Sequence, residues 1–111
     1  MLNGFDTVLQ VVQGNYGFNL PFTCQDSAGV PVDISNATLV FQCQLESNET
    51  VQFSGAMVKV NGPAGTCYYT VQQTDFSVAG VWNAQIIATF SGEVLTFPGI
   101  TITAVAQLPI S

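Results

Sequence analysis

Apolar and polar residues alternate with a period of two along most of this 111-residue chain. The clearest case is the segment from Phe18 to Gln25, in which every second residue is apolar and the residues between are polar or proline. Successive side chains of a β-strand point to opposite faces of a sheet, so this alternation predicts strands with one buried face. No segment carries the spacing of apolar residues that indicates an amphipathic helix. The pattern therefore predicts an all-β protein.

Turn-forming residues divide the alternating segments into about seven or eight strands. The expected strands cover Thr7–Val12, Phe18–Gln25, Ala37–Leu45, Val51–Val60, Thr66–Val71, Val81–Phe90 and Glu93–Val105. We expect a bulge at Gly55 within the fourth strand and an interruption at Pro98-Gly99 within the last. Short strands with turn signals about every 8–12 residues are typical of a two-sheet sandwich. We therefore expect one immunoglobulin-like antiparallel β-sandwich domain over residues 1–111, with residues 1–14 as an N-terminal strand or arm used in assembly.

The inward positions of these strands should form the interior between the two sheets. The positions expected at its centre are Phe22, Cys24, Leu39, Phe41, Cys43, Tyr69, Trp82 and Ile86. Three cysteines are present, an odd number that does not suit a fully paired disulfide framework. Each cysteine lies in an apolar alternating segment, where a free thiol behaves as a small buried hydrophobe. We expect three buried thiols, with one disulfide and a spare thiol as the alternative.

The charge inventory argues against several classes of function. Charged residues make up 7% of the chain, Lys59 is the only basic side chain, Arg and His are absent, and the net charge is -6. One lysine cannot neutralise the phosphates of an extended nucleic-acid site or bind an anionic membrane surface. Without histidine, the usual nucleophile–base relays and the commonest transition-metal ligand are missing. We therefore expect no enzyme, no cofactor, no metal, no nucleic-acid partner and no membrane partner.

Two parts of the chain carry longer motifs. The segment Asp26–Phe41 is similar to the pattern D-x-x-G-x-P-x-D-L-x-G-A-x-V-x-F, and Gly80–Ile86, Phe90–Glu93 and Thr96–Pro98 are similar to G-x-Y/W-x-A-x-(I/V)…F-x-(D/S)-G…T-F-P. Together they resemble the N-terminal immunoglobulin-like domain of phage baseplate upper proteins, over about residues 15–105. Trp82 stands where immunoglobulin-like domains place a corner tyrosine, and Ala84 where antibody domains carry their second cysteine, so the antibody disulfide is not expected.

The resemblance implies a non-enzymatic structural component of a tailed-phage virion, assembled in the host cytoplasm, with other virion proteins and further copies of itself as partners. Because the chain stops at Ser111, we expect a small baseplate or fibre adaptor, a capsid decoration protein, or a fragment. The alternative function is a carbohydrate- or receptor-binding adhesion module on a phage or bacterial surface, with a host surface glycan as ligand. Tyr16 and Tyr68, the rings expected to be most exposed, would then stack on sugar, although ordinary packing is the commoner role of such rings.

The edges of the expected sheets lack the charges that normally prevent pairing with another sheet. Their outward positions carry Gln, Thr, Asn and Ser. We expect oligomer or virion contacts to cover these edges through the strand Thr7–Val12, with Val8, Val11 and Val12 as the candidate assembly residues. The alternative explanation is a compositional bias of the source.

Two pairs of acidic residues are candidates for other chemistry. Asp26 with Asp33, or Glu46 with Glu49, supply the oxygen ligands that Ca²⁺ prefers, but neither pair matches an EF-hand loop. Glu46 and Glu49 also invite comparison with a glycosidase pair, yet a turn does not raise a carboxyl pKa. We expect all four to be solvated turn carboxylates.

Overall fold

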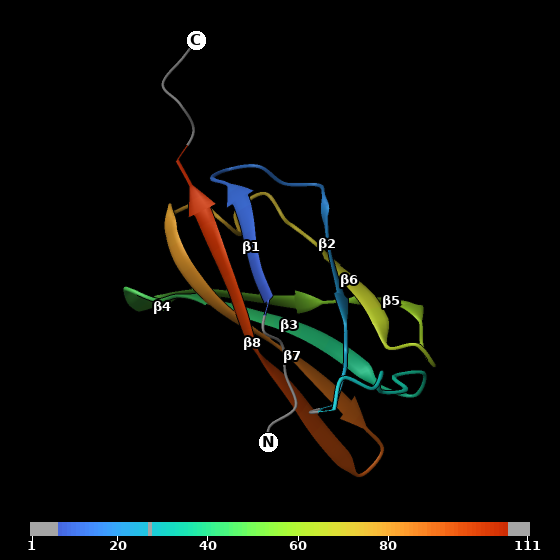
Figure 1. Cartoon of the computed structure of the whole chain (residues 1–111). Coiled ribbons are helices and arrows are strands. Elements are labelled where there is room, and N and C mark those ends of the chain that lie inside the picture. Colours follow the sequence, from blue (N-terminus) through green and yellow to red (C-terminus); the bar gives the residue numbers. More distant parts are fainter. Residues whose placement is uncertain (1–6, 27, 107–111) are drawn as a thin grey trace.

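The chain folds into eight β-strands that form two sheets facing each other (Figure 1). The computed structural model describes residues 7–26 and 28–106, and describes only the backbone of Thr7, Val8 and Glu49. The strands are β1 (Thr7–Val12), β2 (Asn19–Thr23), β3 (Thr38–Leu45), β4 (Asn48–Ala56), β5 (Val58–Asn61), β6 (Thr66–Thr70), β7 (Gly80–Phe90) and β8 (Glu93–Val105). Within these residues no helix is long and apolar enough to cross a membrane. The predicted all-β, immunoglobulin-like sandwich is confirmed.

The two sheets differ in size. The large sheet has five strands in the order β1-β8-β7-β3-β4, and the small sheet has three in the order β2-β6-β5. Apart from β1, this division corresponds to the G-F-C-C′ and B-E-D strands of immunoglobulin domains. One ladder differs from the expected antiparallel arrangement, because β1 runs parallel to β8 with Val11 opposite Ala104. Parallel neighbours need a long connection, and the other six strands of the sandwich lie between β1 and β8 along the chain.

The expected strand Val51–Val60 is in fact two strands in different sheets. β4 pairs with β3 in the large sheet, and β5 pairs with β6 in the small sheet. Met57 alone separates them, and its N–H donates to the carbonyl oxygen of Leu39 at 3.1 Å. The apolar positions change phase here, from Val51 and Phe53 to Val58 and Val60, but such a change fits a bulge within one strand as well as a change of sheet.

The bulge expected at Gly55 is not there, since Gly55 lies in regular register opposite Phe41. The glycine has another purpose. A Cβ atom at this position would lie 2.8 Å from Cε1 of Tyr69 in the small sheet. The missing side chain therefore allows the Tyr69 ring to approach the backbone of β4.

β8 is one strand with a bulge where the interruption was expected. Ala84 of β7 lies opposite Ile100, but Ile86 lies opposite Phe97, so Pro98-Gly99 adds one residue to β8. Gly99 has a φ of 94°, a conformation that favours glycine, and proline is tolerated at a bulge because it gives up no ladder bond. The bend lets the β7–β8 hairpin project beyond the rest of the sandwich (Figure 1).

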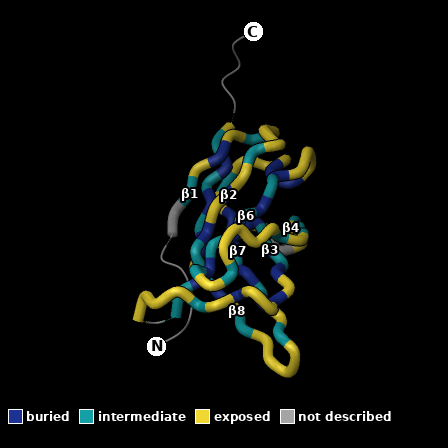
Figure 2. Tube along the Cα trace, turned by 90° about the vertical axis from the view of Figure 1, so that its right-hand side faces the viewer, coloured by how far each residue is buried: buried dark blue, intermediate teal, exposed yellow. Residues whose placement is uncertain are grey.

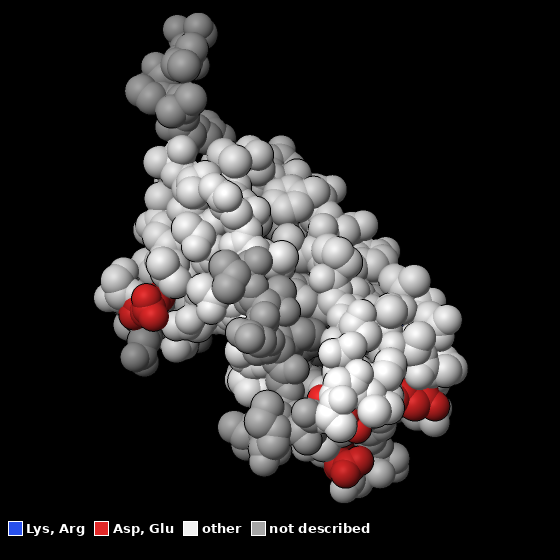
Figure 3. Space-filling view, viewed as in Figure 1, with Lys and Arg blue, Asp and Glu red and all other residues white. Residues whose placement is uncertain are grey.

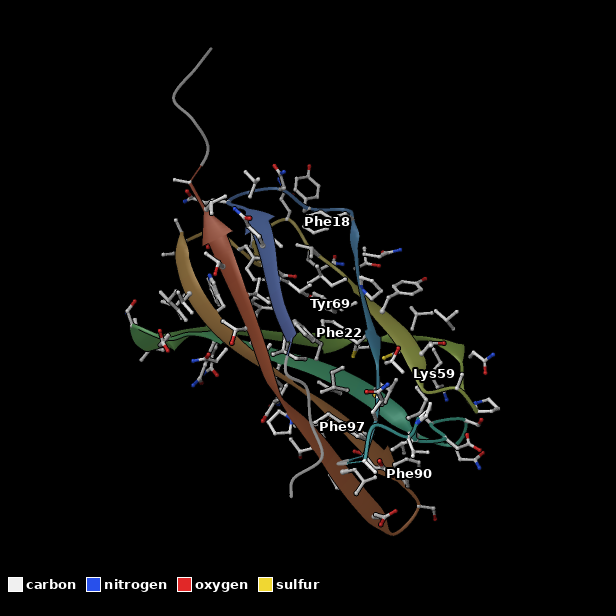
Figure 4. The ribbon with its side chains drawn as sticks, viewed as in Figure 1. Phe18, Phe22, Lys59, Tyr69, Phe90 and Phe97 are labelled. Atoms are coloured by element: carbon white, nitrogen blue, oxygen red, sulfur yellow. The ribbon has the colours of Figure 1, made fainter. Side chains whose placement is uncertain are left out.

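Aromatic rings from both sheets fill the interior. The eight residues expected at its centre are each 5% exposed or less. Phe41 of the large sheet stacks on Tyr69 of the small sheet with 4.8 Å between ring centroids, and Phe76 meets Trp82 edge to face at 5.4 Å. Figure 4 shows Phe22 and Tyr69 near the middle of the molecule, and Figure 2 shows exposed residues gathered in the turns and the hairpin tip.

A small polar network lies at the corner between β6 and β7. Asp75 is 7% exposed, and its Oδ2 accepts hydrogen bonds from the Tyr69 hydroxyl and from the Gln72 N–H, the latter at 2.8 Å. Burial and the neighbouring Asp75 carboxylate raise the pKa of Tyr69. Nearby, the indole N–H of Trp82 donates to the Val78 carbonyl at 3.2 Å. The corner is therefore held by satisfied buried polar groups, which pure alternation does not reveal.

Candidate functional site

β1 forms one edge of the large sheet. It pairs with β8 on one side, and no strand of the described residues lies on its other side. The N–H of Gln13 donates to Val105 of β8 at 2.7 Å. Because successive residues direct their N–H groups to opposite sides of a strand, the N–H of Gln10 is directed to the open edge. The six residues of β1 include no charge and no proline, so nothing in its sequence hinders pairing with another strand.

The three valines proposed as assembly residues have different surroundings. The role of β1 in assembly stays a prediction, but the Val11 side chain is 5% exposed and belongs to the core, so it is not available to a partner. The reason is geometric, since a strand of a sandwich turns every second side chain into the interior. Val12 is 37% exposed and stays available. The side chain of Val8 and residues 1–6 of the expected arm lie outside the described residues.

The outer face of the small sheet contains a hollow of about 700 Å³, here called the small-sheet hollow. An apolar stripe crosses it. The stripe consists of Pro21 on β2, Tyr68 on β6 and Val60 on β5, which line the hollow, and Val58 on β5 lies beside it, opposite Tyr68. Val58 and Val60 are 48% and 66% exposed, and the Tyr68 ring is half-buried. Of the two tyrosines expected to be exposed, Tyr16 is the more exposed, at 56%, but it does not line the hollow.

Neutral polar side chains flank the apolar stripe. They are Asn19, Thr23, Gln25 and Thr66. The Oδ1 of Asn19 accepts a hydrogen bond from the Thr70 hydroxyl at 2.7 Å, so the Asn19 NH₂ group is left to donate to a ligand. Among the described residues, no charged side chain lines the hollow. The face therefore offers an apolar surface with hydrogen-bonding groups at its margins.

The outer face of the large sheet contains a second hollow of about 550 Å³, here called the large-sheet hollow. Amide side chains from three neighbouring strands line it: Gln42, Gln44, Gln52, Asn83 and Gln85. The Nε2 of Gln85 donates to the Oε1 of Gln42 at 2.9 Å. Ser54, Thr101 and the Pro98-Gly99 bulge also line it, together with Cys43, Phe53, Ala84 and Ile100. Sequence analysis found neither hollow, because each is assembled from strands whose pairing the alternation does not specify.

The paired carboxylates belong to turns rather than to a metal site. Oδ1 of Asp26 accepts the N–H groups of Ala28 and Val30 at 2.9 and 3.0 Å. Oδ1 of Asp33 accepts both the N–H and the hydroxyl of Ser35, and these bonds lower the pKa of Asp33. Across the described part of the chain, no group of three or more carboxylate, thiol or imidazole side chains could hold a metal ion.

The other acidic pair is not a pair of turn residues. Glu46 is exposed before β4, but Glu49 lies within β4, and its side chain is outside the description. On the face shown in Figure 3, acidic groups lie at the left margin and toward the lower right, and the rest of the described surface in view is uncharged.

The one basic side chain is also used structurally. The Lys59 ammonium on β5 donates to the carbonyl oxygens of Ser35 and Ala37, both at 2.9 Å. Figure 4 shows Lys59 on the β5 side of the molecule. Its charge therefore ties the segment before β3 to the small sheet, and it does not face either hollow.

All three thiols are free and buried, as expected. A hydrogen bond with the Cys67 thiol, together with burial, raises the pKa of Cys24. Burial and the negative charge of Asp75 raise the pKa of Cys43 to about 12. Because the thiolate is the reactive form, Cys24 and Cys43 are unsuited to nucleophilic chemistry at neutral pH.

Comparison with known proteins does not identify a relative. No protein-family model matches the chain, and no curated protein matches it significantly. The similarity of the two motifs to phage baseplate domains therefore stays a prediction. Among the described residues, β1 is a sheet-edge strand without charge or proline, and each sheet has a hollow on its outer face lined by uncharged side chains.

Proposed function

We propose that this chain is a non-catalytic structural component of a tailed-phage virion, a baseplate or fibre adaptor or a capsid decoration protein. It acts by contacts with other virion proteins and with copies of itself. The observation that carries this proposal is the uncharged outer edge of β1, beside which no strand of the described residues lies. Monomeric β-proteins usually protect such an edge with charge, proline or a covering loop.

The open edge supplies the chemistry of strand addition. A partner strand that pairs with β1 satisfies the backbone groups directed away from β8, such as the Gln10 N–H, and outward side chains then set specificity. Gln10 and Val12 are the exposed members of β1 next to such a partner. Neither carries a charge, so pairing removes no ionised group from water.

The segments that resemble the phage domain support the proposal through their structural roles. Asp26 and Asp33 form hydrogen-bonded turns, and Phe97 is fully buried opposite Ile86. These positions specify turns and core of a sandwich, so the resemblance supports a shared fold more strongly than a shared partner. We infer the virion setting from the resemblance and the contact role from the β1 edge.

Particles purified from the source that encodes this chain provide the test. We expect mass spectrometry to find the chain in the particle and an electron-microscopy map to show a strand of a neighbouring subunit beside β1. Absence of the chain from purified particles, or a solvent-facing β1 in the assembled map, would contradict the proposal.

Solution measurements test the edge itself. In sedimentation velocity at increasing concentration, we expect the purified chain to associate. Gln10→Pro removes the outward N–H and Gln10→Lys adds an edge charge, so both should weaken association. Gln73→Lys is the matched control, because Gln73 is an exposed loop residue and the charge change is the same. Equal association of the parent, the two Gln10 variants and Gln73→Lys would show that the edge of β1 does not mediate association.

A further inference from the structure

We propose that the small-sheet hollow is a binding site for a neutral oligosaccharide, with the Tyr68 ring as the platform on which one sugar ring lies. This site goes beyond the assembly role, because it lies on the sheet that does not contain β1. The two proposals therefore use different surfaces and can fail separately.

The shape of the hollow suits a small ligand. Its volume of about 700 Å³ falls within the range of roughly 300–1,000 Å³ that ligand sites occupy. The floor is rigid, because Phe22 and Cys67 beneath it are buried core residues of β2 and β6. A preformed floor reduces the ordering that binding would otherwise require.

The arrangement of side chains matches the two surfaces of a sugar ring. A pyranose presents C–H groups on its faces and hydroxyl groups around its rim. The apolar stripe of Pro21, Tyr68 and Val60 would receive a C–H face, since burying apolar area drives binding. The amide of Asn19 and the hydroxyl of Thr66 stand at the margins, where rim hydroxyls need donors and acceptors.

The charges select a neutral ligand. In the part of the chain that the structure describes, no acidic or basic side chain lines the hollow, so an anionic sugar would find no cation there and a cationic ligand no carboxylate. Lys59 on the adjacent strand is held by the carbonyls of Ser35 and Ala37. The net charge of -6 also disfavours the approach of anions.

The experiment uses the full chain on a printed array of neutral, sialylated and sulfated oligosaccharides. The best neutral binder is then titrated calorimetrically. Tyr68→Ala should weaken its binding by about tenfold or more, and Tyr68→Phe should retain most of it because the ring remains. Asn19→Leu and Thr66→Val each remove one hydrogen-bonding group at similar size, and should weaken binding by about two- to tenfold.

Two matched controls test the location. Tyr16→Ala removes an equally aromatic but more exposed ring, and Asn83→Leu removes an amide from the large-sheet hollow; neither should change the affinity. Unchanged urea midpoints for all variants would establish that folding is intact.

Several outcomes would overturn the proposal: no binding to any neutral glycan, binding to anionic glycans only, or equal affinity of Tyr68→Ala and the parent. A blank array combined with loss of self-association in Tyr68→Ala would make this face a protein interface instead. The outcomes on the array and in calorimetry leave the β1 edge untouched, whereas loss of self-association in Tyr68→Ala would mean that association also uses the small sheet; the Gln10 variants test the β1 edge separately.

Discussion

On the large sheet, amides and hydroxyls face outward at the hollow, whereas on the small sheet an apolar stripe crosses between polar margins. Both hollows lack charge, and both stand on the same aromatic interior. The amides of the large sheet partly satisfy one another, as in the bond between Gln85 and Gln42. The small sheet instead exposes Val58 and Val60, whose burial would release apolar surface from water.

The difference shows that a missing charge does not by itself define a binding surface. An amide-lined face exchanges hydrogen bonds with water for hydrogen bonds with a ligand, and the net gain is small. A face that combines apolar area with neutral polar margins adds a driving force to that exchange. For this reason we assign the ligand to the small sheet, and the predictions below test how far the two faces are independent.

Removing the ring beneath both faces should have the largest effect. Phe41 lies in β3 of the large sheet and stacks on Tyr69 of the small sheet. Phe41→Ala should lower the free energy of unfolding by about 3–5 kcal/mol, measured by urea denaturation. Val94→Ala, at a position 60% exposed, should change it by less than about 0.5 kcal/mol. A loss below about 1 kcal/mol for Phe41→Ala would mean that the sheets do not share this interior.

Alkaline pH should destabilise the protein through the buried Cys43 thiol, which lies between the two sheets. The pKa of Cys43 is raised from 9.0 to about 12, so the unfolded state loses its proton first as pH rises. The contribution of Cys43 to the free energy of unfolding is therefore complete below pH 9, and it falls by up to about 1.4 kcal/mol per pH unit between pH 9 and 12. Urea midpoints at pH 8, 9, 10 and 11, in reductant, measure this slope.

Cys43→Ala is the control for the alkaline prediction, since it removes this titrating group. The fall in the free energy of unfolding with pH should be shallower for this variant than for the parent. It should not vanish, because the pKa of Tyr69 is also raised in the folded state, so ionisation of Tyr69 in the unfolded state also lowers the free energy of unfolding once the pH exceeds the ordinary tyrosine pKa. Identical slopes for Cys43→Ala and the parent would show that Cys43 does not titrate differently on folding.

Removing one buried hydroxyl should have a moderate effect. Tyr69→Phe takes away the donor to Asp75 and leaves that carboxylate with the Gln72 N–H. We expect a loss of about 2 kcal/mol in thermal or urea unfolding, because hydrogen bonds to charged groups are the stronger ones. Tyr16→Phe, at an exposed ring, should be neutral. A neutral Tyr69→Phe would indicate that water replaces the hydroxyl.

The smallest effect is expected on the amide face. Gln85→Ala removes the half-buried bond to Gln42 and should cost about 0.5 kcal/mol. It should leave glycan affinity at the small-sheet hollow unchanged. If Gln85→Ala weakened that affinity as much as Tyr68→Ala, the two faces would not be independent.

Sequence reasoning succeeded where a local pattern decides the structure and failed where pairing does. Alternation located strands such as Thr7–Val12 and marked Trp82 as an inward ring, whereas the interruption expected at Pro98-Gly99 is a bulge within one strand. It took β4 and β5 as one strand, because the change of phase between Phe53 and Val58 fits a bulge as well as the change of sheet at Met57. It also treated Val11 as a contact residue, although alternation places it in the interior.

The sequence by itself determined that this chain forms strands with one apolar face, that its surface is almost free of charge, and that the side chains of common catalytic sites are scarce. These properties depend on residue type and on the two-residue period of a strand, which are local. Only the tertiary structure decided that β1 runs parallel to β8 with one edge open, and that Pro21, Tyr68 and Val58 meet across three strands. Such neighbours are set by which strands pair and in what register, and contacts between distant segments are not written in any local pattern.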